Sequence, residues 1–277
     1  MAHRTWFITG CSQGIGRELA LELIRRGENV VATARRPETI SDLQTMAPDR
    51  VWTAQLDVTK SDEVKAAVGG AIARFSKVDV VVNNAGYGLR GAAEEVSDDE
   101  FRAILETNLV APMAICREFM PHLRANGGGH IFQVSTQGAQ VAFAGLGAYH
   151  ASKWGLEGFS EAMAQEVAPF GIGVTIIEPG GVRTEWGGAS MQFTKMLSEY
   201  DETPFGQRRK QGRAGQPVGD AAKMAVAIAD AMDLEKLPLR LPLGSDTIRN
   251  VSAAIEARLA EIKSQTEAAA TTDACDA

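Results

Sequence analysis

Cysteine is scarce in this chain. Its 277 residues include three cysteines, Cys11, Cys116 and Cys275, which are too widely spaced for a zinc site and too few for a disulfide framework. Scattered, unpaired cysteines are typical of a reducing compartment. We therefore expect a cytoplasmic protein that binds no metal.

Long apolar runs and a surplus of basic charge are also absent. No run approaches the roughly 20 apolar residues of a membrane span, and a strand expected from Arg4 leaves no room for a signal peptide. The net charge of -7 and the pI near 5.3 argue against a nucleic-acid or anionic-membrane partner. We interpret the single basic run, Arg208-Arg209-Lys210, as a solvated loop.

Hydrophobic residues make up 45% of the chain, which is enough for one substantial core. Short β-branched runs alternate with amphipathic stretches, the pattern of a parallel sheet built from βαβ units. The expected strands cover 5–9, 29–34, 51–58, 78–83, 130–134 and 173–178, with a proline-marked edge strand at 239–243. The fold class predicted is α/β: a single-domain, doubly wound parallel sheet (a Rossmann fold) of about seven strands, with helices on both faces.

Helical patterns fill the spaces between these strands. The expected helices cover 14–26, 38–46, 62–75, 98–124, the stretch around Tyr149, a stretch beginning near Gly219, and 247–263. The folded domain would thus span 1–263, and the small, polar residues 264–277 predict a disordered tail.

Between residues 184 and about 215 the pattern becomes irregular, which is typical of a lid or of disorder. The segment is nevertheless rich in large apolar side chains: Trp186, Met191, Phe193, Met196, Leu197, Tyr200 and Phe205. Two interpretations remain open, a lid over an apolar substrate and simple packing against the body.

The glycine-rich turn Thr9 to Gly16, TGCSQGIG, lies between the first strand and the first helix. Glycines in this position let the backbone approach a pyrophosphate at the helix N-terminus. A P-loop is excluded, because Arg17 and Glu18 stand where it needs a lysine and a hydroxyl residue. The turn predicts a dinucleotide site.

Tyr149 and Lys153 are four residues apart on a predicted helix, so they share one face. A free tyrosine has a pKa of about 10, too high for efficient proton exchange at neutral pH. A neighbouring ammonium lowers that pKa by stabilising the phenolate. The pair is therefore a candidate acid–base site, whereas His150 points about 100° away around the helix and is interpreted as structural.

Four motifs in this order resemble the classical short-chain dehydrogenases/reductases. They are TGxxxGxG at 9–16, Asn83-Asn84-Ala85-Gly86 after the fourth strand, YxxxK at 149–153, and PGxxxT at 179–184. The resemblance covers roughly Arg4 to Leu243. It implies an oxidoreductase that interconverts a ketone or aldehyde and an alcohol by hydride transfer, with Tyr149 as general acid/base.

The resemblance also assigns the other catalytic positions. Lys153 would lower the pKa of Tyr149 and bind the nicotinamide ribose, and Asn108 would support a water in the proton relay. A hydroxyl group thirteen positions before the tyrosine would polarise the carbonyl. An ungapped count reaches Thr136, but Ser135 would take that place if the loop were one residue longer.

Cofactor-binding positions follow from the same resemblance. Asn83, in contrast, is expected to tie neighbouring strands together. The implied cofactor-binding set is Gly10, Ser12, Gln13, Gly14, Ile15 and Gly16 in the turn, Arg35, Asp57 and Val58 near the adenosine, Asn84, Ala85 and Gly86 along its ribose, then Tyr149, Lys153, Val182 and Thr184.

The second strand ends in Thr33-Ala34-Arg35-Arg36, with no acidic residue to hold a ribose 2′-hydroxyl. Guanidinium groups instead bind a 2′-phosphate in a fork. This favours NADP (NADPH) over NAD, with Arg35 as the expected contact, and NAD remains the alternative.

Other functions remain open at this stage. One is a non-catalytic NADP-binding regulatory or scaffold protein of the same fold, and another is a related enzyme acting on an activated acyl chain or a sugar nucleotide. Length and apolar lid are more similar to carbonyl reductases of steroids, retinol and comparable apolar substrates. The family implies a homodimer or homotetramer formed through the helices from Asp98 and Tyr149, unless the extension after Leu243 replaces that surface.

Overall fold

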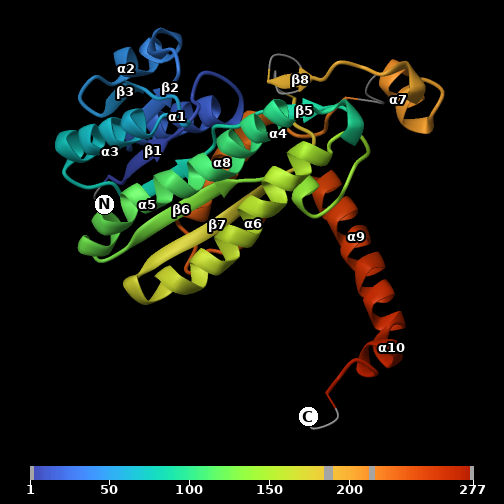
Figure 1. Ribbon diagram of the computed structural model, residues 1–277. Helices are drawn as coiled ribbons and strands as arrows, with labels where there is room; N and C mark the ends of the chain where they lie inside the picture. Colours follow the sequence, from blue (N-terminus) through green and yellow to red (C-terminus); the bar gives the residue numbers. More distant parts are fainter. Residues whose placement is uncertain (1–2, 184–189, 212–215, 275–277) are drawn as a thin grey trace.

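The computed structural model describes residues 3–183, 190–211 and 216–274. Its centre is a sheet of seven parallel strands in the order β3-β2-β1-β4-β6-β7-β9 (Figure 1). The bounds are β1 Thr5–Ile8, β2 Asn29–Ala34, β3 Val51–Gln55, β4 Val80–Asn83, β6 Gly129–Val134, β7 Ile172–Pro179 and β9 Arg240–Leu243. The doubly wound parallel sheet predicted from the sequence is confirmed, and β9 occupies an edge as expected.

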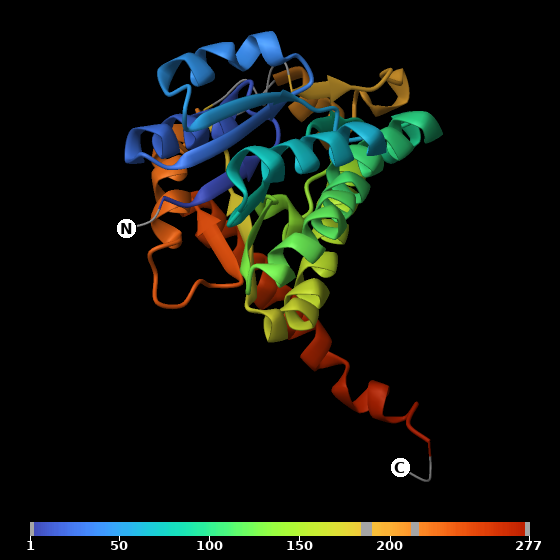
Figure 2. The same ribbon diagram turned by 90° about the vertical axis from the view of Figure 1, so that its left-hand side faces the viewer.

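Helices cover both faces of this sheet (Figure 2). Leu19 and Leu23 of α1 and Ile228 of α8 pack on one face, and Phe119 of α5 and Met163 of α6 pack on the other. Trp6 and Phe7 show why, since successive side chains of a strand point to opposite faces and both are buried. The helix bounds are α1 Gly14–Arg26, α2 Ser41–Met46, α3 Ser61–Phe75, α4 Asp98–Leu105, α5 Ala111–Ala125, α6 Gly147–Val167, α7 Pro204–Gln211 and α8 Ala221–Ala231.

The order of the sheet reverses beside β1. The chain runs outward from β1 to β2 and β3 and then returns to β4 on the other side of β1. At such a switch point the loops after the strands separate and leave a crevice at the carboxyl edge, where doubly wound folds bind ligands. The glycine turn after β1 and the Asn83–Gly86 motif after β4 both lie at this edge.

The long helix expected over 98–124 is interrupted, so that prediction is wrong in detail. A π-helical turn, η3 Glu106–Val110, separates α4 from α5, and the Ala111 amide donates to the Glu106 carbonyl five residues back. Pro112 lacks the N–H that would continue the α-helical pattern at this point. A single wide turn accommodates that loss and contains Asn108.

The segment expected to be irregular carries more order than predicted. Residues 190–211, here called the lid segment, contain β8 Met191–Phe193, a short turn η7 Ser198–Tyr200 and α7. Strand β8 pairs in parallel with β5 Gly88–Arg90, a strand that the sequence analysis missed. Both strands are only three residues long, too short for a period-2 pattern to stand out. Thr184 and Trp186 lie outside the described residues.

The basic run at 208–210 is not simply a solvated loop, because Arg209 forms a buried ion pair. Its Nη1 lies 2.7 Å from Glu95 Oε1, and the two side chains are 8% and 0% exposed. Glu95 also accepts from the amides of Leu197 (2.9 Å) and Ala92 (2.7 Å). A carboxylate with these partners is satisfied inside the protein, so it fastens the lid segment to the body. Arg208 remains exposed.

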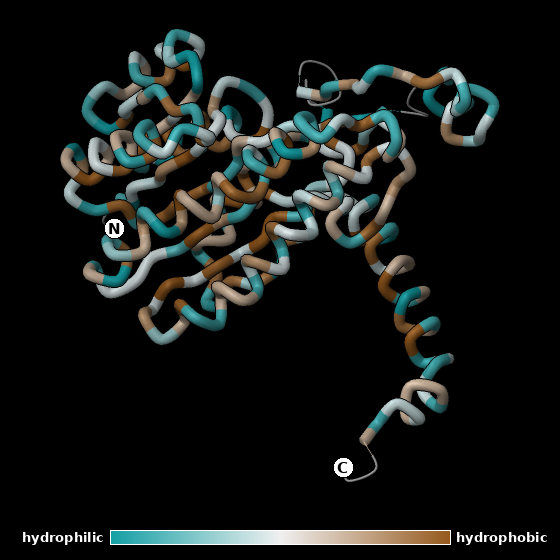
Figure 3. Tube along the Cα trace, in the orientation of Figure 1, coloured by the Kyte–Doolittle hydropathy of each residue, from teal (hydrophilic) through white to brown (hydrophobic). Residues whose placement is uncertain are grey.

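Beyond β9 the chain continues as α9 Ser245–Ser264 and α10 Thr266–Ala270, which project from the body (Figures 1 and 2). Within the tail expected to be disordered, residues 266–270 are helical in the structure, where successive alanines favour helix. Hydrophobic and hydrophilic residues recur in turn along α9 (Figure 3). In the described part of the chain, no helix is long and apolar enough to cross a membrane.

Replacing Arg209 by Met should loosen the lid segment without unfolding the domain, because Glu95 loses its charged partner. The amide of Leu197, which donates to Glu95, should exchange its hydrogen about 10- to 100-fold faster, given the size of a charge-assisted hydrogen bond. Hydrogen exchange measured by mass spectrometry or NMR tests this. Arg208→Met is the matched control, and equal exchange in both variants would refute the fastening.

Candidate active site

The predicted motifs converge at the carboxyl edge of the sheet. The glycine turn follows β1, Asn83–Gly86 ends β4, Ser135 and Thr136 follow β6, and Gly180–Val182 follow β7. Helix α6 carries Tyr149 and Lys153 over the same edge. Residues far apart in the sequence are thus gathered beside the switch point between β1 and β4.

The glycine turn requires its glycines. Gly10 and Gly14 have φ angles of +73° and +65°, which other residues adopt only with strain. A Cβ on Gly16 would collide with the side-chain amide of Asn84 and would lie 2.7 Å from the Gly10 carbonyl oxygen. Gln13, the N-cap residue of α1, makes no side-chain hydrogen bond to the first turn in the described structure, so those amides can serve an anion.

The other predicted turn residues surround this helix end. Ser12 and Gln13 are exposed and Ile15 is half-buried. Gln13 Nε2 donates to Ser190 Oγ of the lid segment at 2.6 Å. The lid segment therefore reaches the glycine turn as well as the body.

Hydrogen bonds from the Asn83–Gly86 motif connect neighbouring strands and hold the glycine turn at this edge. Asn83 Nδ2 donates to Gln133 Oε1 at 3.0 Å, which ties β4 to β6 as predicted. Asn84 Nδ2 donates to the carbonyls of Thr9 (2.8 Å) and Gly10 (3.0 Å), so its amide nitrogen is committed to the turn. The amides of Asn84 and Ala85 both donate to Thr9 Oγ1. The motif holds the glycine turn in place.

Tyr149 and Lys153 lie four residues apart on the buried face of α6, and each is 5% exposed. Lys153 Nζ donates to the Val134 carbonyl at 2.8 Å. Burial raises the pKa of Tyr149, and a hydrogen bond with the Thr136 side chain acts in the opposite direction. Burial lowers the pKa of Lys153 to about 8, opposed by the negative charge of Glu157.

The direction for the phenol differs from the sequence argument, which expected the cation to lower its pKa. Tyr149 belongs to a small apolar cluster with Leu89, Ile104 and Ala148, and such surroundings disfavour the phenolate. At neutral pH the tyrosine therefore stays protonated and ready to donate, while the lysine is largely cationic.

The structure separates the two candidate hydroxyl groups. Thr136 forms the side-chain hydrogen bond with Tyr149, and its Oγ1 also accepts from the Gly138 amide at 3.2 Å. Ser135 Oγ instead donates to Glu157 Oε1 at 2.6 Å. Thr136, the residue reached by the ungapped count, is the one beside the tyrosine.

Asn108 lies fully buried in the π-helical turn. Its Oδ1 accepts from the Tyr87 amide at 3.1 Å, and its Nδ2 donates to the Tyr87 carbonyl (2.9 Å) and to Ser152 Oγ (3.1 Å). A Cβ on Gly86 would lie 3.0 Å from Asn108 Oδ1 and 3.6 Å from Lys153 Nζ, so the three residues meet. Sequence reasoning missed the parts of Tyr87 and Ser152, which no motif marks.

The remaining predicted residues frame the edge of the site. Arg35 is exposed at the end of β2. Burial alone would raise the pKa of Asp57, but hydrogen bonds from Thr59 and the charges of Arg35 and Lys60 outweigh it and lower that pKa. Arg35 and Asp57 therefore face one region, with half-buried Val58 next to it. Val182, also half-buried, forms a parallel bridge with Gly219.

His150 has a structural environment, in line with its interpretation from the sequence. Its Nε2 accepts from the Phe143 amide at 3.0 Å, and a Cβ on Gly138 would lie 2.7 Å from the ring. The ring thus holds the loop that precedes α6.

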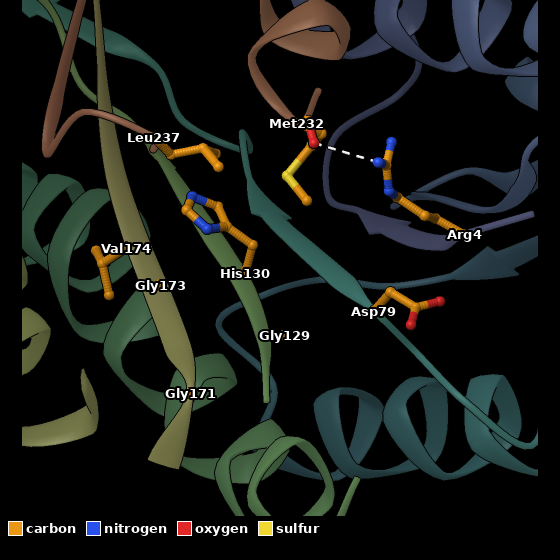
Figure 4. Close-up of a pocket in the computed structure, with 9 residues that line it drawn as sticks. All are labelled: Arg4, Asp79, Gly129, His130, Gly171, Gly173, Val174, Met232 and Leu237. Atoms are coloured by element: carbon orange, nitrogen blue, oxygen red, sulfur yellow. Dashed lines mark hydrogen bonds between the residues drawn. The ribbon is translucent and has the colours of Figure 1, made fainter. Parts of the chain in front are cut away.

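The walls of two cavities in the described structure do not include Tyr149. One, of about 440 Å³, lies between the lid segment and the loop before α6, with Ala92, Ala144, Tyr200 and Phe205 in its wall. The other, of about 450 Å³, opens at the opposite end of the sheet, where β1, β4, β6 and β7 begin (Figure 4). There Arg4 donates to the Met232 carbonyl at 3.2 Å, and burial lowers the pKa of His130 to about 4.

Comparison with known proteins gives consistent matches. The short chain dehydrogenase family matches residues 4–194. An oxidoreductase of Botryotinia fuckeliana, BOA17, is 39% identical over 256 residues, which are 91% of this chain and 93% of that protein.

Solved structures agree over the whole fold. A short-chain dehydrogenase from Streptomyces avermitilis superposes with a TM-score of 0.91 at 38% identity, covering 98% of this chain and 99% of that one. An alcohol dehydrogenase from Thermococcus sibiricus, complexed with 5-hydroxy-NADP, has a TM-score of 0.73 at 25% identity and covers 87% and 96%.

Proposed function

The chain belongs to the short-chain dehydrogenase family, and on that premise we propose that it is an NADP-dependent oxidoreductase interconverting a ketone or aldehyde and an alcohol. The observation that carries the proposal is the group of Tyr149, Thr136 and Lys153 beside the glycine turn. A protein that only binds a nucleotide has no need of a buried acid with a hydroxyl partner and a buried cation.

The glycine turn fits a dinucleotide, because added Cβ atoms would fill it and the first amides of α1 are free of a side-chain cap in the described structure. When bound, the nicotinamide cofactor supplies or accepts the hydride. In the reducing direction Tyr149 donates its proton to the carbonyl oxygen, and Thr136 donates a hydrogen bond to that oxygen. The hydroxyl groups of Tyr149 and Thr136 are neighbours, so one carbonyl oxygen can accept from both of them.

Lys153 and Asn108 assist proton transfer by Tyr149 without giving up a proton to the substrate. The cation of Lys153 stabilises the phenolate that remains after proton transfer, and Lys153 would also bind the nicotinamide ribose of the cofactor. Asn108 keeps the Tyr87 backbone and Ser152 in place around the lysine. We assign it the support of the proton relay, in agreement with its position in the family.

Arg35 supports the choice of NADP. Its exposed guanidinium follows β2 without a carboxylate at the same position, so it can bind a 2′-phosphate. The Thermococcus relative in complex with 5-hydroxy-NADP agrees with this choice. NAD is the alternative cofactor.

A bulky apolar carbonyl compound or alcohol is the proposed substrate class. The lid segment carries Met191, Met196 and Tyr200 over this end of the molecule, and the 440 Å³ cavity beside it has alanine and aromatic walls. Most of this wall is apolar and suits an apolar surface, and Thr203 and Arg208 add polar groups to it. We place the activity in the cytoplasm.

We also propose a homodimer paired through α9. Large apolar residues of α9 recur on one side of this projecting helix: Ile248, Val251, Ile255, Leu259 and Ile262. Four of them are exposed, and Val251 is partly exposed. They stand four and seven residues to either side of Ile255, so two antiparallel copies crossing there place apolar residues opposite each other. The complementary partner for this stripe is therefore a second copy of the chain.

Replacing Tyr149 by Phe removes the proton donor and keeps the ring. Turnover of carbonyl compounds by NADPH should fall at least about 100-fold, the lower range for loss of a general acid, while NADPH binding followed by fluorescence stays near wild type. Thr136→Ser should retain more activity than Thr136→Val, because only the hydroxyl polarises the carbonyl. Unchanged turnover in Tyr149→Phe would refute the mechanism and favour the non-catalytic alternative.

Changing Arg35 to Asp should weaken NADPH binding about 10- to 100-fold, the value of a charge-assisted hydrogen bond to phosphate. NADH binding should be equal or tighter, because a carboxylate at this position can bind the ribose 2′-hydroxyl. Parallel fluorescence titrations with both nucleotides measure this. Arg124→Asp, at an exposed site at the end of α5, provides the matched charge change, and a wild-type preference for NADH would overturn the assignment.

Ile255→Glu should convert the dimer to a monomer, because two carboxylates would meet at the crossing point. Sedimentation velocity of wild type and variant at several concentrations gives the result. Ala253→Glu introduces the same charge on the opposite side of α9 and should leave the dimer intact. A monomeric wild-type protein would contradict the pairing.

A further inference from the structure

Three carboxylates surround one guanidinium next to the proposed catalytic group, by which we mean Tyr149, Thr136 and Lys153. Glu157 and Glu161 come from α6, Glu178 from β7 and Arg240 from the edge strand β9. Arg240 bonds all three carboxylates, with Glu161 Oε1 at 2.5 Å. Glu157 and Glu178 are each 3% exposed, whereas Glu161 is about half exposed. The proposed reaction uses none of these groups directly.

Glu157 differs from its neighbours in what it touches. Its Oε1 accepts from Ser135 Oγ at 2.6 Å, and its Oε2 accepts from Gln140 Nε2 at 2.5 Å and from Arg240 Nη1. The carboxylate is thus held from α6, from the edge strand and from the loop after β6. A buried carboxylate with this many donors has one fixed position.

Ser135 links that position to the catalytic group. The preceding residue, Val134, accepts from Lys153 Nζ through its carbonyl, and the following residue, Thr136, bonds Tyr149. Glu157 stands one helical turn after Lys153 on α6. A closed ring results, from Lys153 through the end of β6 to Glu157 and back along one turn of helix.

Building on the proposed function, we propose that Glu157 is a positioning residue for proton transfer by Tyr149. Through Ser135 it fixes the carboxyl end of β6 against α6, and it places a negative charge one helical turn from Lys153.

The charge should be visible in the pH dependence of reduction. Lys153 shares one face of α6 with Glu157 and Tyr149, and its Nζ contacts an uncharged carbonyl of β6. Glu157 in turn faces Arg240 of β9, Glu178 of β7 and Glu161 of α6. Burial lowers the pKa of Lys153 to about 8 and Glu157 opposes this shift. Without the Glu157 charge the ammonium loses its proton at lower pH, so activity that needs the cation is lost earlier as pH rises.

The deciding experiment compares Glu157→Gln with Glu161→Gln by measuring kcat for carbonyl reduction by NADPH against pH. Both variants take a carboxylate from Arg240, but Glu157 alone of the two contacts Ser135 and influences Lys153. The alkaline limb should move down by about one pH unit in Glu157→Gln, the size expected from a nearby opposite charge. It should stay in place in Glu161→Gln, and identical profiles would overturn the proposal.

Ser135→Ala removes the hydrogen bond between Ser135 and Glu157 but keeps the Glu157 carboxylate. It also provides a test if Glu157→Gln does not fold. Loss of the hydroxyl frees the end of β6, so kcat should fall about 10-fold, the equivalent of one hydrogen bond. The alkaline limb should keep its wild-type position, because the Glu157 carboxylate is still present one turn from Lys153. Wild-type kcat in Ser135→Ala would refute the link.

A titration of lysine side chains labelled with ¹³C at Cε tests the charge without any substrate. Lys153→Arg identifies the Lys153 signal, whose pKa should be lower in Glu157→Gln than in wild type and Glu161→Gln. An unshifted signal would refute the electrostatic part. If no carbonyl compound is reduced by the wild type, the proposed function fails, and this titration still decides whether Glu157 controls the lysine.

Discussion

The contact between α6 and the carboxyl end of β6 is the constraint on which the site depends. Helix α6 carries Tyr149 and Lys153. Thr136, just after β6, is the hydroxyl partner of Tyr149, and Val134 at the end of β6 offers its carbonyl to Lys153. The two elements pair through side chains as well, since Glu157 reaches Ser135. A shift of either element by one residue would break all three contacts together.

Burial sets the electrostatics of this contact. Tyr149 and Lys153 are both removed from water, which raises the pKa of the phenol and lowers that of the ammonium. The higher pKa of the phenol keeps Tyr149 neutral. The lower pKa of the ammonium is unfavourable for proton transfer, because only a cationic Lys153 stabilises the phenolate. The Glu157 carboxylate one turn away opposes the second shift, and Arg240 holds that carboxylate in place. The buried carboxylate of Glu157 is tolerated here because it accepts from Ser135, Gln140 and Arg240 together.

Much of the fold and part of the site could be predicted from the sequence, and the failures have physical causes. Strand and helix order follow from periodicity and the glycine turn, both of which are local. The π-helical turn escaped because one proline, Pro112, changes hydrogen bonding inside an otherwise helical pattern. Partners such as Glu95 with Arg209 escaped because their separation along the chain is 114 residues. No local pattern records such a distance.

The choice between Ser135 and Thr136 shows where sequence spacing stops and packing decides. Both residues carry a hydroxyl, and they are adjacent, so residue type and count alone leave both roles possible. Once Glu157 accepts from Ser135, that hydroxyl is directed toward the charge network, and Thr136 is left beside Tyr149. The hydroxyl that we propose to act on the carbonyl is therefore selected by a carboxylate 22 residues from Ser135, and that carboxylate is held by an arginine 83 residues further along the chain. The edge strand β9 thereby belongs to the active-site architecture although it carries no reacting group.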